Sequence, residues 1–293
     1  MDKSKGILLS AFGRVGYIYA AFNMCASIKN FNKDVKVCLA FDREIFKYLS
    51  PEKIALFDDL IEIPKEQFTS YRIDPAKYKT SIYNYLPYDE TLILDVDGCA
   101  LQDLQPLIDK LSSLEGDIFT DVLGSGGKDD NITYSIWASN AYIWERFNLS
   151  GTSILPAIQS SFMYVKKGQI KEFFDSVESN YKEGVDRNQI NLWGGTVPDE
   201  LIFSATMAQY GINPKIDFSP IFFGNYFAQE SFSELGEKFY VLSLYGNGVG
   251  RKETKQRYID YYDRIMRVYC SNLEISHDYK SGFIMQDKHL NFK

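Results

Sequence analysis

The first part of the chain alternates between short apolar runs and segments with apolar residues at helical spacing. The run Gly6–Ala11 precedes Tyr17–Lys29, in which apolar residues recur every three or four positions, and this pair predicts a strand followed by a helix. Further short apolar runs at Val35–Ala40, Leu60–Ile63 and Leu92–Leu94 predict more strands. Because strands and helices alternate, we expect a mostly parallel sheet with helices on both faces.

The rest of the chain continues this pattern less regularly. Helices are predicted at Asp74–Leu86, Leu101–Leu114, Gln169–Tyr181, Pro198–Tyr210 and Glu253–Tyr269, and strands at Asp117–Thr120, Ile158–Val165 and Phe239–Leu244. The polar segment Gly124–Asn131 is interpreted as a flexible surface connection. No repeat or clear linker divides the chain, so we expect one α/β domain over residues 1–257 and a C-terminal helical extension and tail over 258–293.

Composition excludes several classes of function. The chain of 293 residues has 32 Lys and Arg against 39 Asp and Glu, a formal net charge of −7, which makes duplex nucleic acid an unlikely partner. Only two histidines are present, His277 and His289. Both lie near the C-terminal end of the sequence, which argues against a Ser-His-Asp hydrolase and a His-ligated zinc enzyme.

The spacing of the cysteines and the hydropathy of the chain bear on the cellular compartment in which the protein is expected. The four cysteines lack CxxC spacing and are interpreted as buried thiols in a reducing environment. The apolar run near Met1 is shorter than the ~7 residues of a signal-peptide core, and no window approaches the ~18 apolar residues of a membrane span. We therefore expect a cytoplasmic protein without a membrane span.

The most informative feature is an acidic pair, Asp95 and Asp97, directly after the apolar run Leu92–Leu94. Side chains at i and i+2 of an extended chain point to the same side, and two close carboxylates favour a cation between them. Carboxylates that also bind substrate phosphates are typical ligands of Mg²⁺, and the carboxyl ends of strands are where open α/β sheets bind ligands. The pair therefore predicts a Mn²⁺ or Mg²⁺ site, with a solvated turn as the alternative.

The segment LPYDETLILDVDGCALQDLQPL (residues 86–107) resembles the sequence around the DxD motif of GT-A glycosyltransferases, in the glycogenin and galactosyltransferase-like families. Over roughly residues 6–255, four other segments resemble further parts of these families: Leu9–Ile28, Ile158–Val165, Pro198–Glu200 and Val241–Lys252. The resemblance implies a GT-A-like (Rossmann-like) α/β fold. It also implies a metal-dependent hexosyltransferase that uses a nucleotide-diphosphate sugar, most naturally a UDP-sugar, and it favours retention of configuration.

The resemblance implies roles for individual residues. The cation would be held by Asp95, Asp97 and Ser243, the last standing where the family has a histidine. The nucleotide and its phosphates would be bound by Ser10, Ala11, Phe12, Tyr17, Lys79, Gly246, Gly248, Arg251 and Lys252. The donor sugar would contact Gln159, Ser160 and Ser161, with Asp199 and Glu200 near the reacting centre and Gln159 also in the catalytic group. Trp193 is a candidate platform for an acceptor sugar.

Each of these residues also has a structural interpretation. Phe12, Tyr17 and Trp193 are as easily core residues, Lys79 would otherwise lie on a solvated helix face, and Asp199 and Glu200 would otherwise cap a helix. An acidic DxD-Gly motif is also found in haloacid dehalogenase-like phosphatases, where Asp95 would be the nucleophile. A non-catalytic GT-A-derived binding protein is a third hypothesis.

The sequence does not identify the acceptor, which could be a glycan, a protein, a lipid or a modified base. A homo-oligomer is also compatible with the sequence.

Overall fold

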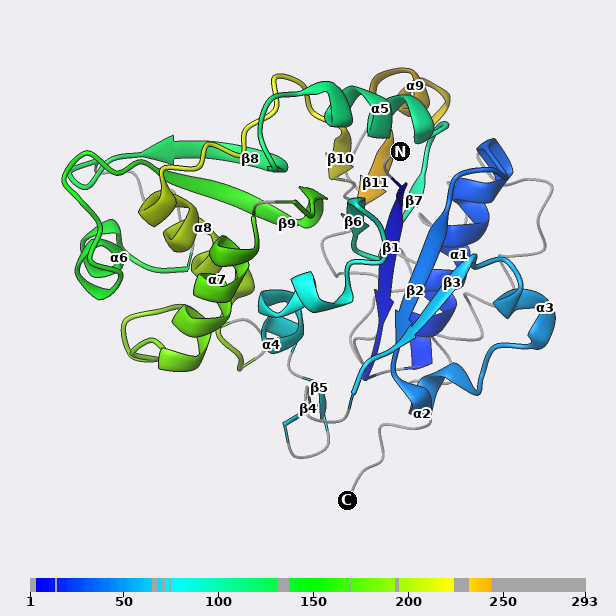
Figure 1. The fold of residues 1–293 in the computed structure, drawn as a ribbon, viewed down its shortest axis with the longest axis horizontal. Helices are drawn as coiled ribbons and strands as arrows, with labels where there is room; N and C mark the ends of the chain where they lie inside the picture. The colour runs from blue at the N-terminus through cyan, green and yellow to red at the C-terminus, as the bar shows by residue number, and fades with distance from the viewer. Residues whose placement is uncertain are drawn as a thin grey trace. The chain divides into compact units, whose positions relative to one another are not determined.

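The computed structural model describes residues 4–13, 15–64, 68–69, 72–73, 75–130, 137–168, 170–192, 195–223 and 232–243. These residues belong to two compact units (Figure 1). The first unit comprises the described residues within Met1–Pro64, Thr91–Leu114 and Phe218–Lys293, and the second comprises those within Lys65–Glu90 and Glu115–Asp217. The predicted helix Glu253–Tyr269 and the predicted boundary after residue 257 lie outside the described residues and stay predictions.

The first unit is built on parallel strands. Strand β1 (Lys5–Ala11) pairs in parallel with β2 (Val37–Phe41), and β2 pairs in parallel with β3 (Asp59–Glu62). Strand β6 (Glu90–Leu94) lies on the other side of β1. All five residues of β2 are buried, as expected for a strand covered on both faces. The predicted mostly parallel sheet is confirmed.

Helix α1 (Val15–Phe31) packs alongside these strands (Figure 1). Twelve of its 17 residues are buried, so it lacks a wide solvent face and behaves as a core helix. The remaining helices of this unit are shorter: α2 (Arg43–Phe46), α3 (Pro51–Ile54), α5 (Gln105–Ser113) and α9 (Phe232–Lys238).

A small second sheet also belongs to the first unit. It orders β10 (Ile221–Phe223), β11 (Val241–Ser243) and β7 (Gly98–Ala100), with β11 parallel to β10 and antiparallel to β7. Ser27 of α1 fixes this sheet to the helix, because its Oγ accepts a hydrogen bond from the Ala100 amide at 2.9 Å. The residues directly after the acidic pair, which form β7, are thereby fixed both to β11 and to α1.

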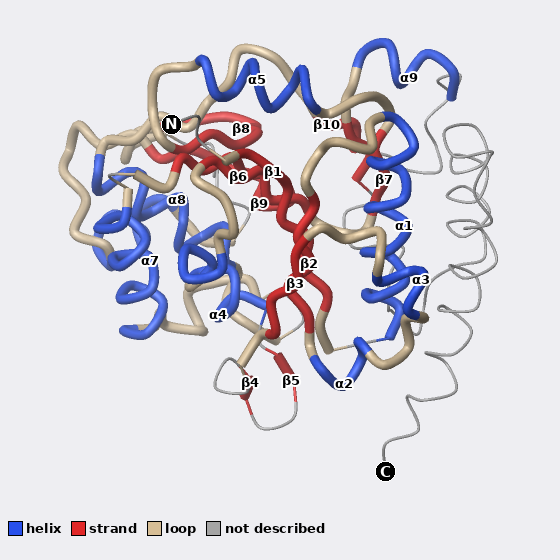
Figure 2. The backbone as a smooth tube through the Cα atoms, turned by 45° about the vertical axis from the view of Figure 1, so that its right-hand side comes forward, coloured by secondary structure: helices blue, strands red, loops and turns tan. Residues whose placement is uncertain are grey.

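The second unit is built around one long antiparallel pair. Strand β8 (Ile118–Gly126) pairs with β9 (Leu155–Lys166), with irregularities at Thr120/Asp121 and Val122/Gly124. Helix α8 (Asp199–Tyr210) packs on β9 and on α7 (Lys171–Glu183), and Figure 2 shows the two helices side by side. The other elements are β4 (Phe68–Thr69), β5 (Arg72–Ile73), α4 (Pro75–Thr80), the 3₁₀ helix η2 (Ile82–Tyr85) and α6 (Asn140–Arg146).

Three sequence expectations are corrected. The supposed loop Gly124–Asn131 is strand as far as Gly126, which pairs with Leu155; glycines have no side chains with which to signal a strand. The predicted helix Asp74–Leu86 is interrupted at Ser81, whose φ of −101° and ψ of 12° are not helical, and it continues as the 3₁₀ helix η2. The predicted helix at Leu101 begins only at Gln105.

Burial also bears on the cysteines. Cys25, Cys38 and Cys99 are free and buried, as expected, and Cys270 lies outside the described residues. Burial raises the pKa of the Cys38 thiol to about 12 and also raises the pKa of the Cys25 thiol, so neither is a thiolate at neutral pH. In the part of the chain that the structure describes, no helix has the length and apolar character to cross a bilayer.

Candidate active site

The acidic pair lies between two strands of the first unit. Strand β6 ends at Leu94, and β7 begins at Gly98 immediately after Asp97. Asp97 is only 5% exposed, Val96 between the two acids is 4% exposed, and Asp95 is half-buried. A buried carboxylate is costly unless charge or hydrogen bonds compensate it. The pair therefore does not belong to the solvated turn of the alternative interpretation.

Strand β11 brings Ser243 beside the acidic pair. Ser243 is the register partner of Gly98 and is itself 5% exposed. The pairing requires glycine, since a Cβ at position 98 would lie 1.8 Å from the carbonyl oxygen of Leu242. The strand pairing that places Ser243 opposite Gly98 is one that no local pattern indicates. The role of Ser243 as a cation ligand stays a prediction.

These three residues suit a hard divalent cation that also takes ligands from a substrate. Two carboxylates and a hydroxyl supply oxygen ligands only, which Mg²⁺ and Mn²⁺ prefer. Within the described ranges no group of three or more His, Cys, Asp or Glu side chains is placed to hold a metal. The described residues around the acidic pair therefore do not by themselves form a closed protein cage.

The end of β1 is fixed by a residue that the sequence analysis missed. The Asp42 amide donates to the Ala11 carbonyl at 3.0 Å. The Asp42 carboxylate accepts from the Gly13 amide at 3.3 Å and, as the N-cap of α2, from the Glu44 amide at 2.9 Å. Asp42 thereby fixes the chain at Ala11 and Gly13, at the end of β1 and just after it. Its signal is local, because an aspartate before a short helix is a typical N-cap.

The predicted nucleotide-binding residues from the end of β1 into α1 have unequal exposure. Ser10, Phe12 and Tyr17 are half-buried, so their side chains reach the surface. Ala11 is fully buried, and its methyl group is part of the core. A role for Ala11 in binding is therefore limited to its backbone.

In the second unit, two adjacent carboxylates begin helix α8. Pro198 is the N-cap and makes no side-chain capping bond, and Asp199 and Glu200 form the first turn. Both oxygens of Glu200 have partners from outside the helix: Oε2 accepts from Nε1 of Trp137 at 2.8 Å, and Oε1 accepts from the Ser160 amide at 3.2 Å. Glu200 thus joins β9 to the Trp137 segment, which the helix-capping interpretation does not explain.

Lys79 of α4 completes this group, which we call the carboxylate cluster (Lys79, Ser160, Asp199 and Glu200). Its Nζ lies 3.7 Å from Oδ2 of Asp199 and donates to Oγ of Ser160 at 3.2 Å and to the Ser160 carbonyl at 3.4 Å. The side chains of Lys79 and Asp199 are each 18% exposed. The interpretation of Lys79 as part of a solvated helix face is therefore wrong.

Two polar atoms in and beside the carboxylate cluster lack hydrogen bonds. Among the described residues, Oδ2 of Asp199 and Oγ of Ser161 are buried and have no hydrogen-bond partner; the 3.7 Å separation from Lys79 is an ion pair, not a hydrogen bond. Buried polar atoms are nearly always paired in folded proteins. Atoms left unpaired beside a cluster of charges are suited to bind the hydroxyl groups of a ligand.

The environment of Glu200 changes its acidity. Burial and, after it, the neighbouring Asp199 charge together raise the pKa of Glu200 from its ordinary value to about 7. The Trp137 hydrogen bond, the Lys79 charge and the Ser160 amide act in the opposite direction. The carboxyl group consequently changes charge close to neutral pH, which is typical of functional carboxylates.

A further acid, Asp121, was missed by the sequence analysis. It is the register partner of Gln159 across β8 and β9, and such partners present their side chains on the same face of a sheet. Burial raises the pKa of Asp121. The irregularity at Thr120/Asp121 interrupts the alternation by which a sequence reveals which residues share a face. Asp121 of β8 and the half-buried Gln159 of β9 therefore form a second polar group, across the two paired strands.

Several predicted residues lie outside the described residues: Trp193, Gly246, Gly248, Arg251 and Lys252. Their expected contacts with an acceptor or with phosphates stay predictions.

Comparison with known proteins was informative at the level of structure. No protein-family model and no curated protein matches the sequence. A structure of the apo WbbM bifunctional glycosyltransferase is similar to 97% of this chain at 12% identity with a TM-score of 0.59, and this chain spans about half (52%) of WbbM. The galactosyltransferase LgtC, in complex with donor and acceptor sugar analogues, is similar at 12% identity and a TM-score of 0.54, over 92% of this chain and 96% of LgtC.

A third similar structure is the apo form of the glycosyltransferase GlyE from Streptococcus pneumoniae TIGR4. It shares 12% identity and a TM-score of 0.52, over 96% of this chain and 64% of GlyE. Identities this low establish the fold and leave the reaction to be argued from the site. The chain has the fold of the GT-A-type glycosyltransferases.

Proposed function

We propose that this protein is a glycosyltransferase that transfers a sugar from a nucleotide-diphosphate donor, most simply a UDP-sugar, to an acceptor. The observation that carries the proposal is the carboxylate cluster, with buried unpaired oxygens at Asp199 and Ser161. The fold, shared with glycosyltransferases, supports the same reaction class.

Asp95 and Asp97 would hold the cation, Mn²⁺ or Mg²⁺, with Ser243 beside them. When bound, such a cation acts as a Lewis acid that neutralises charge on the departing diphosphate. The chain's own contribution is a fixed geometry, because the β7–β11 pairing at Gly98 and Ser243 sets the position of the motif. Ser10, Phe12 and Tyr17, which lie in β1, after it and in α1, would bind the base and the ribose.

The sugar would be bound by short polar groups of the second unit. Asp199 Oδ2 and Ser161 Oγ offer acceptors for sugar hydroxyls, and Gln159 and Asp121 offer a second polar group. Glu200 is held rigidly by Trp137 and Ser160. In its ionised form it would stabilise the positive charge that develops on the sugar as the bond to the diphosphate breaks.

The stereochemical course follows from the role of Glu200. The sequence resemblance to glycogenin-like enzymes favours retention, in which Glu200 and Asp199 orient and stabilise the sugar. In an inverting enzyme one of these carboxylates would instead remove the proton of the acceptor hydroxyl. The anomeric configuration of the isolated product distinguishes the two courses.

The alternatives make different predictions. A haloacid dehalogenase-like phosphatase would use Asp95 as a nucleophile, but the fold is that of glycosyltransferases. A non-catalytic GT-A-derived protein would bind nucleotide without turning over any donor. The fixed and buried Glu200 favours an enzyme, because a binding protein has no need of a carboxylate that titrates near neutral pH.

The direct test is release of nucleoside diphosphate from a panel of nucleotide sugars, with Mn²⁺ or Mg²⁺ present. We expect one donor to be turned over, and we expect E200Q and D95N each to lower the rate about 10²-fold or more. D109N is the matched control, since Asp109 is an exposed acid paired with Lys5. Binding of a nucleotide sugar without release of diphosphate from any donor would contradict the proposal and favour the binding protein.

A further inference from the structure

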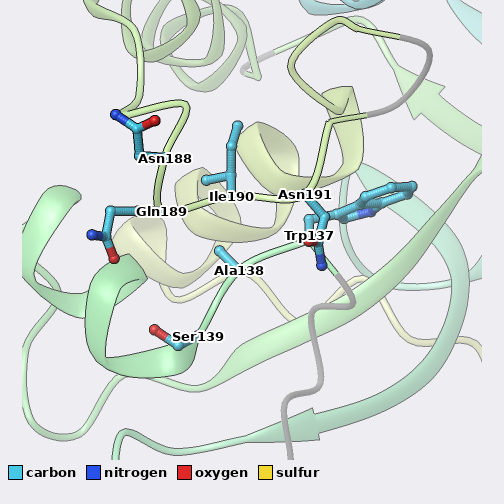
Figure 3. Close-up of a pocket in the computed structure, with 7 residues that line it drawn as sticks. All are labelled: Trp137, Ala138, Ser139, Asn188, Gln189, Ile190 and Asn191. Atoms are coloured by element: carbon cyan, nitrogen blue, oxygen red, sulfur yellow. The ribbon is translucent and has the colours of Figure 1, made fainter.

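A polar pocket of about 330 Å³ lies in the second unit, next to the segment that carries Trp137 (Figure 3). It is lined by two segments, Trp137–Ser139 and Asn188–Asn191. We call it the amide pocket, because three of its seven lining residues, Asn188, Gln189 and Asn191, have carboxamide side chains. Its volume lies at the small end of the range for small-molecule sites, about 300–1,000 Å³.

Backbone contacts fix the two segments in place. Ala138 and Ile190 form an antiparallel bridge, and the Asn191 amide donates to the Trp137 carbonyl at 2.6 Å. On the other side, Asp186 accepts hydrogen bonds from the amides of Asn188 and Gln189, each at 2.9 Å. The pocket is therefore preorganised by the protein backbone, so little ordering is left for a ligand to bring about.

The chemistry of the lining selects a class of ligand. None of the lining residues carries a formal charge, so the pocket offers no cation to a phosphate and no counter-ion to an ammonium group. Each carboxamide supplies two N–H donors and one carbonyl acceptor, and Ser139 adds a hydroxyl. Asn188 and Gln189 are exposed, so their side-chain amides are accessible to a ligand. Ala138 and Ile190 supply an apolar surface between these polar groups.

Paired donors and acceptors beside a small apolar surface match a neutral sugar, whose hydroxyl groups both donate and accept around an apolar ring. The same segment also reaches the carboxylate cluster. In Figure 3 the Trp137 ring extends away from Gln189 and Ser139, and its Nε1 donates to Glu200 at 2.8 Å. A ligand in the amide pocket would thus lie against Trp137, the residue whose ring nitrogen positions Glu200.

We propose that the amide pocket binds a neutral sugar unit of the acceptor, so that the acceptor is a glycan or a glycan-bearing molecule. This inference rests on the proposed glycosyltransferase function and narrows its acceptor class. It requires that binding depends on Asn188 and Gln189 rather than on the donor site.

The test is binding of the purified protein to an array of neutral and charged glycans, without donor, followed by titration of the best neutral glycan. We expect the wild type to bind neutral glycans and the double variant N188A/Q189A to bind them at least tenfold more weakly. N84A is the matched control, because Asn84 is an exposed amide of the same unit outside the pocket; it should bind as the wild type does.

The outcomes separate this inference from the proposed function. Wild-type protein that releases diphosphate from a nucleotide sugar but binds no neutral glycan, or binds it equally well after N188A/Q189A, overturns the sugar pocket alone. Glycan binding that depends on Asn188 and Gln189 in a protein that turns over no donor overturns the proposed transferase and leaves the pocket standing. Selective binding of charged glycans would also contradict the inference.

Discussion

At the scale of the residue, Glu200 is the group on which most of the proposed chemistry depends. It is buried, it accepts one hydrogen bond from Trp137 and one from Ser160, and its pKa is raised to about 7. Its partners lie 63 and 40 residues away in the sequence. A helix-opening acid can be predicted from sequence, but the environment that raises its pKa depends on contacts that no local pattern shows.

The first prediction concerns the pH dependence of the reaction. If ionised Glu200 stabilises the reacting sugar, the rate of donor turnover should rise as the pH increases through about 7. D199N removes a neighbouring negative charge and should move this inflection to lower pH. K79M removes a positive charge and should move it to higher pH. Rate profiles of the wild type and both variants check these directions, and an inflection that neither substitution moves would contradict them.

The second prediction concerns stability, and its sign follows from the same carboxyl group. The pKa of Glu200 is higher in the folded protein, about 7, than its ordinary value of 4.5, so the folded state binds more protons between these values. Glu200 therefore makes its whole contribution to the free energy of unfolding below about pH 4.5. This contribution is lost as the pH rises to about 7.

Urea denaturation of the wild type and E200Q at several pH values measures this contribution. E200Q has no titrating group at this position, so its stability relative to the wild type should increase between pH 5 and pH 8. A constant difference between the two proteins over this range would show that Glu200 has an unperturbed pKa.

At the scale of the element, the long helices and the buried strands were predictable and the short connections were not. Helices α1 and α8 lie within a few residues of their expected limits, because apolar residues recur through them over several turns. Strand β7 has three residues, too few for any periodicity. It forms through pairing with β11, more than 140 residues later in the chain.

The candidate-site residues also divide into those with a local sequence signal and those that depend on contacts distant in the sequence. Asp95 and Asp97 could be proposed from the sequence because the apolar strand directly before them is a local signal, and their role as cation ligands stays a prediction. Asp121 was missed, since the irregularity of β8 conceals which face it shares with Gln159. The role of Trp137 could not be found either, because its contact with Glu200 depends on tertiary packing.

The third prediction tests how α1 supports the small sheet behind the acidic pair. Ser27 is fully buried, and its Oγ donates to the Met24 carbonyl at 2.7 Å and accepts from the Ala100 amide at 2.9 Å. S27A leaves the Ala100 amide unpaired in the core, so we expect a loss of about 1–3 kcal/mol in the free energy of unfolding.

The matched control is S113A, because Ser113 is exposed and its hydroxyl contacts only its own helix. It should change stability by less than about 0.5 kcal/mol. Equal effects of the two substitutions in urea denaturation would mean that the Ser27 hydrogen bond does not stabilise the β7 sheet.

At the scale of the whole molecule, the candidate groups divide between the two units. The first unit contains the parallel strands, the acidic pair and Ser243, and the second contains the carboxylate cluster and the amide pocket. A shortage of histidine in the composition first excluded whole classes of enzyme. Among the described residues, no group of three or more His, Cys, Asp or Glu side chains is placed to hold a metal.

The central claim is that the acidic pair binds a nucleotide sugar through a divalent cation. The most direct test is a thermal-shift titration of the wild type with nucleoside diphosphates and nucleotide sugars, with and without Mn²⁺. Ligand binding to the folded state raises the melting temperature by mass action. We expect a rise of several degrees that requires both a uridine nucleotide and the metal and is abolished in D95N/D97N. A wild-type protein that no nucleotide or nucleotide sugar stabilises, or a metal-dependent shift that persists in D95N/D97N, would contradict the claim.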